Sequence, residues 1–167
     1  MYSFRLLKAI AVLVSVGLVV ASLHVHTNLF VSAANIADVS DTLSDSSPGS
    51  PSNHTIAFTT PTGINNGETV TIDFSDGPFT GTSSITVADI DVQAGATDLS
   101  VAANCAGSDE IGASFTGSVL TIEFCSGNGA AVGANGSTTI EIGNHADFGG
   151  SGSNQLVNPA STGSFDI

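Results

Sequence analysis

The carboxylates are the side chains of this sequence whose type and spacing best suit them to chemistry. Its 167 residues include 15 Asp and Glu but only 2 Lys and Arg. Asp89 and Asp91 are two positions apart, which puts both side chains on one face of a strand, and Asp73 and Asp76 lie where another predicted strand ends. Because calcium binds carboxylate and carbonyl oxygens, these two pairs are candidate ligands for a Ca²⁺ ion.

Neither aspartate pair matches the calcium loop of an EF-hand. A solvated acidic face, which keeps a protein soluble and needs no metal, explains the same residues. We therefore expect no cofactor unless it is calcium. Because no Lys or Arg follows Lys8, crowding among the carboxylates should raise their average pKa on folding and make the folded state more stable in mild acid.

Other catalytic chemistry has few candidate residues. After residue 33 the sequence contains two histidines, His54 and His145, and no Tyr, Lys or Arg. General bases and phosphate clamps would have to come from carboxylates, hydroxyls and backbone alone. The stretch Gly112–Thr116 departs from a nucleophile elbow at its last position, where Thr replaces Gly. We predict no catalytic residues, no enzyme activity and no binding of nucleic acid, which requires basic side chains.

The N-terminal segment has the pattern of an export signal. Arg5 and Lys8 precede an apolar run, Ala9–Leu23, and small residues follow at Val31–Ala34. This order predicts a signal peptide over residues 1–33 and a protein that is secreted or held at the cell surface. The alternative is an uncleaved anchor, but the apolar run spans about 22 Å as a helix, less than the roughly 30 Å of a bilayer core.

The sequence contains two cysteines, Cys105 and Cys125. In an exported protein such a pair predicts a disulfide, whereas a metal or redox pair would need closer ligand spacing. Cys125 shares its strand parity with Thr121 and Glu123, which predicts a position on the outer face. The bridge should therefore join a strand end to the acidic loop Ala106–Gly112 and leave the core untouched.

Two triplets fit the sequon for N-glycosylation. They begin at Asn53 (Asn-His-Thr) and Asn135 (Asn-Gly-Ser). Such triplets also arise by chance, and they matter only where the host glycosylates exported proteins.

The elements that must position these residues are strands. Apolar residues alternate with Thr and Asp in several short runs separated by Gly, Pro and Asn. The predicted strands are 54–60, 68–74, 84–87, 90–93, 99–103, 118–124, 138–142 and 163–167. We predict an all-β, immunoglobulin-like β-sandwich of about seven to nine short strands, preceded by an N-terminal hydrophobic signal helix, with a jelly roll or small barrel as alternatives.

The same alternation predicts the core and the domain organisation. The residues expected to point inward are Ile56, Phe58, Val70, Ile72, Phe74, Leu120, Ile122, Phe124, Ile140 and Ile142. The apolar positions are odd-numbered at Ile85 and Val87 but even-numbered at Ile90 and Val92. This change predicts a bulge or a strand that switches sheets. Residues 34–52 are acidic and rich in Ser, which predicts an N-terminal arm and linker ahead of a sandwich domain at 53–167.

Three segments carry a resemblance to a known group of proteins. Ser40–Ser44 reads SDTLS, Ser52–Gly63 reads SNHTIAFTTPTG, and Asn154–Pro159 reads NQLVNP. With these motifs the chain resembles a family of uncharacterised exported proteins from candidate-phylum bacteria. The resemblance implies an immunoglobulin-like surface or secreted β-domain and carries no catalytic residues across.

These observations favour a noncatalytic exported protein of the cell surface that acts in adhesion, in a coat or in a filament. Its expected partners are other surface proteins, further copies of itself or glycans, and it would meet a membrane only through an uncleaved N-terminal segment. The alternative function is a calcium-dependent module that binds a glycan or a protein. A hydrolase built on paired carboxylates would require a deep cleft that holds both.

Overall fold

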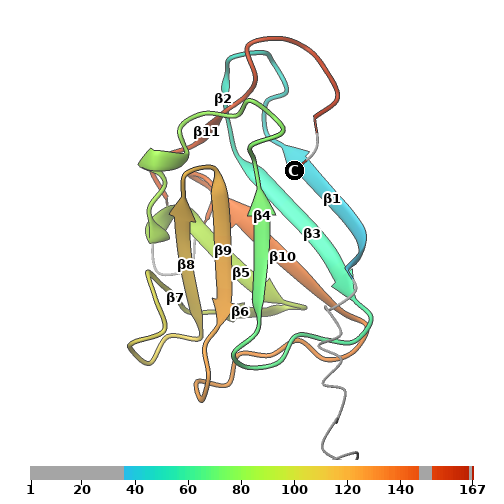
Figure 1. Cartoon of the computed structure of the whole chain (residues 1–167), viewed down its shortest axis with the longest axis vertical. Helices are drawn as coiled ribbons and strands as arrows, with labels where there is room; N and C mark the ends of the chain where they lie inside the picture. Colours follow the sequence, from blue (N-terminus) through green and yellow to red (C-terminus); the bar gives the residue numbers. More distant parts are fainter. Residues whose placement is uncertain (1–35, 147–151, 166) are drawn as a thin grey trace, which may run out of the picture. The chain divides into compact units, whose positions relative to one another are not determined.

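The computed structural model describes residues 36–146, 152–165 and 167, and the predicted signal segment lies outside them. The described residues build an all-β, sandwich-like structure of two main sheets (Figure 1). Seven of its strands have five or more residues, and the others have two or three. Among the described residues, no helix is long and apolar enough to cross a membrane.

The larger sheet has the strand order β1-β3-β10-β5-β6. Its strands are β1 (Ala37–Leu43), β3 (His54–Thr60), β10 (Gly136–Ile142), β5 (Ile90–Ala94) and β6 (Thr97–Leu99). All its pairs are antiparallel. Its central strand, β10, pairs with β3 through Ile140 opposite Ile56 and with β5 through Ile140 opposite Val92.

The smaller main sheet has the order β4-β9-β8-β7. It contains β4 (Thr69–Asp73), β9 (Val119–Phe124), β8 (Ile111–Thr116) and β7 (Val101–Ala102), and the pair β7–β8 is parallel. A separate pair joins β2 (Pro51–Ser52) to β11 (Leu156–Val157). Figure 1 shows β4, β9 and β8 lying in front of β3, β10 and β5, as two layers.

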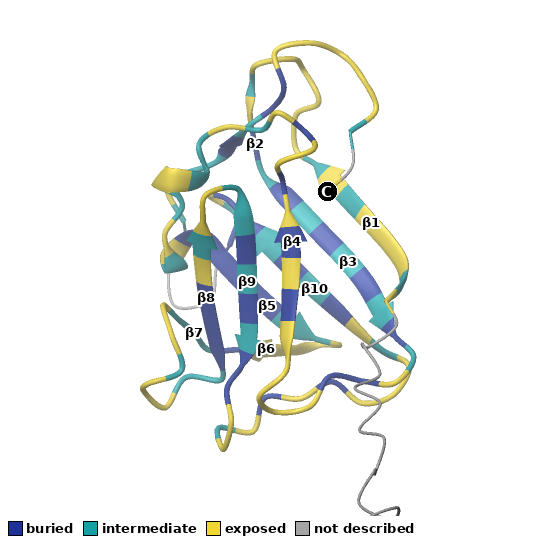
Figure 2. Cartoon of the chain, in the orientation of Figure 1, coloured by how far each residue is buried: buried dark blue, intermediate teal, exposed yellow. Residues whose placement is uncertain are grey.

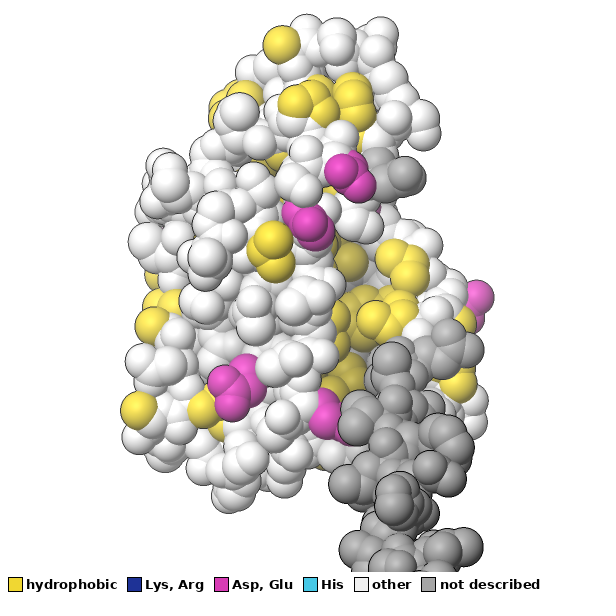
Figure 3. Space-filling view, in the orientation of Figure 1, with side chains coloured by type: hydrophobic (Ala, Val, Ile, Leu, Met, Phe, Trp, Pro, Cys, Tyr) yellow, Lys and Arg dark blue, Asp and Glu magenta, His cyan; other side chains and the backbone are white. Residues whose placement is uncertain are grey.

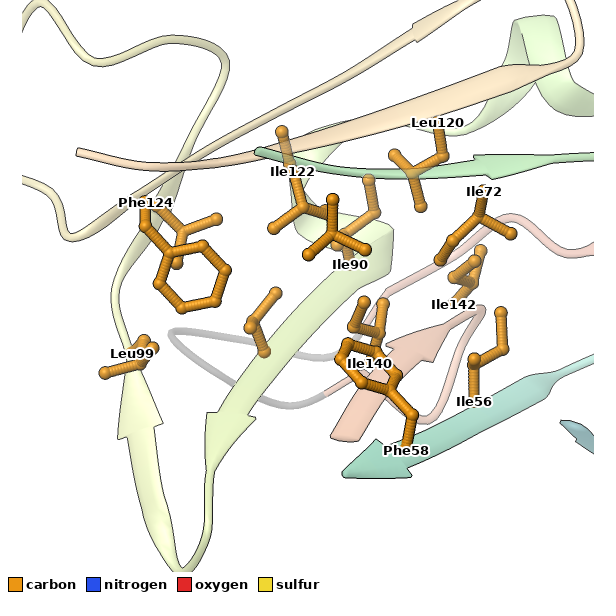
Figure 4. Packing of buried hydrophobic residues seen from close by; sticks show 14 of the residues in the cluster. Ile56, Phe58, Ile72, Ile90, Leu99, Leu120, Ile122, Phe124, Ile140 and Ile142 are labelled. Atoms are coloured by element: carbon orange, nitrogen blue, oxygen red, sulfur yellow. The ribbon is translucent and has the colours of Figure 1, made fainter. Parts of the chain in front are cut away.

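The core lies between the two sheets, and all ten residues predicted to point inward are buried. In Figure 4 Ile72, Leu120 and Ile122 face Ile56, Ile90 and Ile140 from the opposite sheet. Figure 2 shows β3 and β4 changing burial at every residue, which is the period of a strand with one face inward. The predicted strands 54–60, 68–74, 90–93, 118–124 and 138–142 are confirmed, with bounds that differ by at most two residues.

Other predicted strands were wrong. Residues 84–87 do not form a strand: Ser84 ends the 3₁₀ turn η1 (Thr82–Ser84), Val87 begins the 3₁₀ turn η2 (Val87–Asp89), and the extended residues between them, Ile85 and Thr86, pair with no described strand. The change of parity there comes from η2, not from a bulge or a change of sheet. Residues 163–165 and 167 are irregular, and residues 99–103 divide at Ser100 between β6 and β7.

The predicted arm contains a full strand of the larger sheet. β1 pairs with β3 over most of its length, from Ala37 opposite Thr59 to Leu43 opposite His54. Its register shifts between Ala37 and Ser40, where Asp38 takes a positive φ of 54°. The following segment, predicted as a linker, contributes β2 to the pair with β11.

Candidate functional site

Asp89 is used as a structural acceptor, contrary to the prediction of a shared strand face with Asp91. It ends η2 and is fully buried. Its Oδ1 accepts hydrogen bonds from the backbone N–H groups of Ser153 (2.6 Å) and Asn154 (2.8 Å). Its Oδ2 accepts from the N–H and hydroxyl of Thr86, both at 2.8 Å, and from Asn154 Nδ2 at 2.9 Å. This carboxylate therefore ties η2 to a segment 64 residues later in the chain.

At three carboxyl groups, Asp45, Asp73 and Asp89, the pKa moves opposite to the expected crowding effect. Burial raises the pKa of Asp89, but hydrogen bonds from Asn154, Thr86 and Ser153 outweigh it and leave the pKa well below the ordinary value. Hydrogen bonds from Ser75 lower the pKa of Asp73, and those from Ser47 lower the pKa of Asp45. At these three groups, local hydrogen bonding has more effect than repulsion between carboxylates.

Asp73 and Asp76, the second candidate calcium pair, are both exposed. Asp73 is the last residue of β4. Its side chain accepts a hydrogen bond from the Ser75 N–H at 2.9 Å, which stabilises the turn that follows the strand. Within residues 36–146, 152–165 and 167, no group of three or more His, Cys, Asp or Glu side chains could hold a metal ion.

Asp91 instead lies opposite Glu141, a pairing that sequence reasoning missed. Asp91 is fully buried in β5, and Glu141 occupies the matching position of β10. His145 Nε2 lies 3.9 Å from Glu141 Oε1 and 3.0 Å from Thr55 Oγ1. The outward parity of Asp91 and Glu141 was visible in the sequence, but their strand register was not. The side chains share the outer face of the larger sheet, and no hollow described below includes them.

A second polar pair, with one member buried, joins β1 to β3. His54 is fully buried, and its Nδ1 lies 2.7 Å from Asp41 Oδ2. The His54 ring makes edge contacts with Phe74 and Phe79 at centroid distances of 5.7 and 5.3 Å. This arrangement makes His54 a packing residue that fixes β1 against β3.

The disulfide between Cys105 and Cys125 is present, with a Cα–Cα distance of 5.2 Å. It joins the end of β9 to the loop after β7, as predicted. Cys125 is fully buried, however, and not on an open outer face. The loop is held beside Cys125 by hydrogen bonds: Asn128 Nδ2 donates to the backbone oxygens of Gly107 and Asp109, and the Cys125 N–H donates to the Glu110 oxygen.

The two sequon asparagines differ in their surroundings. Asn53 is half-buried, its Nδ2 donates to Asn144 Oδ1 at 2.7 Å, and its Oδ1 accepts from Gln155 Nε2 at 2.8 Å. Asn135 is exposed in the turn before β10 with a φ of 60°. A glycan on Asn53 would displace bonds between loops, whereas Asn135 presents its side chain to solvent.

The surface of the described residues includes two hollows whose linings are largely apolar. One, of about 200 Å³, lies among the loops around Phe79, Phe165, Pro48 and Pro159. The other is a groove of about 220 Å³ between the edge of β4 and the pair β1–β3. We call it the seam groove; its lining is apolar except for Thr71. It is slightly larger than the hollow around Phe79 and lies beside an edge of β4 that no described strand occupies.

Comparison with known proteins gave no match to any family model, curated protein or solved structure.

Proposed function

We propose that this protein is a noncatalytic, exported protein of the cell surface that works by contact, in adhesion, a coat or a filament. The seam groove is the observation that carries the proposal. Among the described residues, the large hydrophobic side chains that are exposed are Ile36, Val39 and Ile167, and all three line this groove. Exposed apolar surface concentrated in one place marks a protein contact.

The rest of the molecule supports a role as a rigid scaffold. Asp89 and the His54–Asp41 pair join distant segments, and the disulfide closes a loop of 20 residues. A disulfide of this kind suits an oxidising compartment, in agreement with the predicted signal at 1–33. As the finer fold we propose an immunoglobulin-like sandwich that departs from the usual strand pairing. β10, the last long strand, pairs with β3 at the place that strand E holds in that fold, and the pair β7–β8 is parallel.

The test is location and contact on intact cells. Antibodies and an endoproteinase specific for Glu should reach the protein without permeabilisation, and deleting the gene should reduce attachment between cells or to surfaces. Trypsin and amine-reactive labels are unsuitable, because no Lys or Arg follows Lys8. Protein found only inside cells would contradict the proposal, and attachment unchanged by deletion would exclude the role in adhesion.

A calcium-dependent module that binds a glycan or protein is the second candidate. The pairing of Asp91 with Glu141 on neighbouring strands is the observation that favours it, because carboxylate oxygens are the ligands that calcium prefers. Retention on polysaccharide or cells that needs calcium, and that equal ionic strength from sodium chloride does not reproduce, would favour this function.

A further inference from the structure

The seam groove lies between strands of two different sheets. Val70 and Ile72 of β4 form one wall, and Ile56 and Phe58 of β3 form the other, with Val39 of β1 beside them. Figure 3 shows hydrophobic side chains gathered in a hollow in the region between β4 and β1. The exposed fractions, 60% for Val39 and 40% for Ile36, leave apolar surface in contact with water.

The strand beside the groove has a backbone edge that no described strand occupies. Among the described residues, β4 ends its sheet and pairs with β9 alone. The bonds Phe124 N–H to Glu68 O and Phe74 N–H to Ser118 O show that even-numbered residues face β9. Because antiparallel ladders alternate, the N–H and C=O groups of Thr69, Thr71 and Asp73 point away from β9, along this edge.

These two features together fit an added β-strand. A segment hydrogen-bonded to Thr69, Thr71 and Asp73 would extend the four-stranded sheet, and every second side chain would point between the sheets, into the seam groove. The apolar lining calls for Val, Ile or Leu at those inward positions. The remaining side chains would stay at the rim of the groove.

Charge at the rim selects the partner. Asp38 belongs to the β1 side, and Glu68 and Asp73 belong to the β4 side, and all three are exposed. No Lys or Arg occurs after Lys8 to offset them. A second copy would bring further carboxylates, whereas Lys or Arg side chains would be attracted. We propose that the seam groove accepts an extended segment of another surface protein, in which apolar residues alternate with Lys or Arg.

This inference rests on the proposed function and names the partner of the same groove. The probe is a synthetic, fluorescein-labelled peptide in which four Lys alternate with three Val, and the protein is the full chain. One control peptide replaces Lys by Glu, and another groups the same Val and Lys residues into blocks. Val39→Asn removes apolar surface at an exposed site, and Ala96→Asn is the matched change at an exposed turn outside the groove.

We expect the alternating Val/Lys peptide to raise fluorescence anisotropy and the two control peptides to bind weakly. Val39→Asn should weaken binding about tenfold, as expected for losing much of the burial of one Val side chain, while Ala96→Asn leaves it unchanged. Added salt should also weaken binding. In hydrogen exchange the peptide should protect the Thr71 amide, while Ile72, already bonded within the sheet, changes little.

Several results would overturn the proposal. No peptide binding, or equal binding of the Val/Lys and Val/Glu peptides, contradicts the partner chemistry. A dimer or polymer that Val39→Asn dissociates assigns the groove to a second copy. A Thr71 amide protected before peptide is added means that the chain itself covers the edge. These measurements need only purified protein, so their failure is distinct from failure of the surface assignment on cells.

Discussion

Replacing Asp89 by Asn should destabilise the protein strongly, although it changes only one functional group. The Asn Oδ1 can still accept from the N–H groups of Ser153 and Asn154. Its Nδ2, however, would face the Thr86 N–H and Asn154 Nδ2, two of the three donors that now bond to Oδ2; the third, the Thr86 hydroxyl, can rotate and accept from it. A hydrogen bond to a charged group contributes about 1.5–3 kcal/mol, so two lost bonds at a buried site correspond to about 3–6 kcal/mol.

The assay is urea unfolding followed by far-UV circular dichroism, with Asp76→Asn as the control because Asp76 is exposed. The Asp76 variant should lie within about 0.5 kcal/mol of the wild type. The folded pKa of Asp89 is below its ordinary value of 3.8. The stability that the Asp89 carboxylate adds to the folded state is therefore fully present above pH 3.8 and is lost as the pH falls through the folded pKa. The difference in unfolding free energy between the two variants should therefore shrink in acid.

Equal stability of the Asp89 and Asp76 variants at neutral pH would refute this account of Asp89. So would a calcium-specific rise in Tm, measured against sodium chloride at matched ionic strength, that disappears in Asp89→Asn. That result would make Asp89 a metal ligand, as the sequence first indicated.

Three further predictions concern the core and its links. Phe124→Ala should cost about 3–5 kcal/mol and Thr121→Ala under about 1 kcal/mol; similar losses in urea unfolding would contradict the inward and outward assignment in β9. The double change Cys105→Ala and Cys125→Ala should lower the free energy of unfolding by about 3 kcal/mol, the loop-entropy value for a loop of this length. Stability equal to that of the wild type in non-reducing buffer would contradict this stabilising role of the disulfide. His54→Leu keeps the side chain's volume but removes its bond to β1, so calorimetry should show a loss of about 1–3 kcal/mol; a stabilised variant would mean that the pair with Asp41 is a net cost.

The strands with large alternating side chains were predictable from the sequence. His54–Thr60 was predicted with the bounds of β3, because Ile56 and Phe58 alternate with Thr and Ala. β8 was missed because Gly112, Ala113 and Ser114 give little contrast between its two faces. The prediction of a strand at 84–87 was wrong because Ile85 and Val87 have the two-residue spacing of a strand but lie in a segment that forms short turns.

The candidate site was less predictable, because its chemistry depends on contacts far apart in the sequence. The donors to Asp89 from Ser153 and Asn154 come from 64 and 65 positions away. Nothing in the local sequence indicates that Asp89 meets them. The seam groove likewise depends on which strands end the sheets, and strand order does not follow from periodicity.

The covered position of Cys125 sets an order of events during biogenesis. Thiol–disulfide exchange needs an accessible sulfur; Cys125 is fully buried, whereas Cys105 is half-buried. An oxidant that meets the folded, reduced chain would therefore form its mixed disulfide at Cys105, and the Cys125 thiol would then displace it to close the bond. If the chain is exported unfolded, in line with the proposed function, both sulfurs are accessible before the Asn128 bonds hold that loop in place.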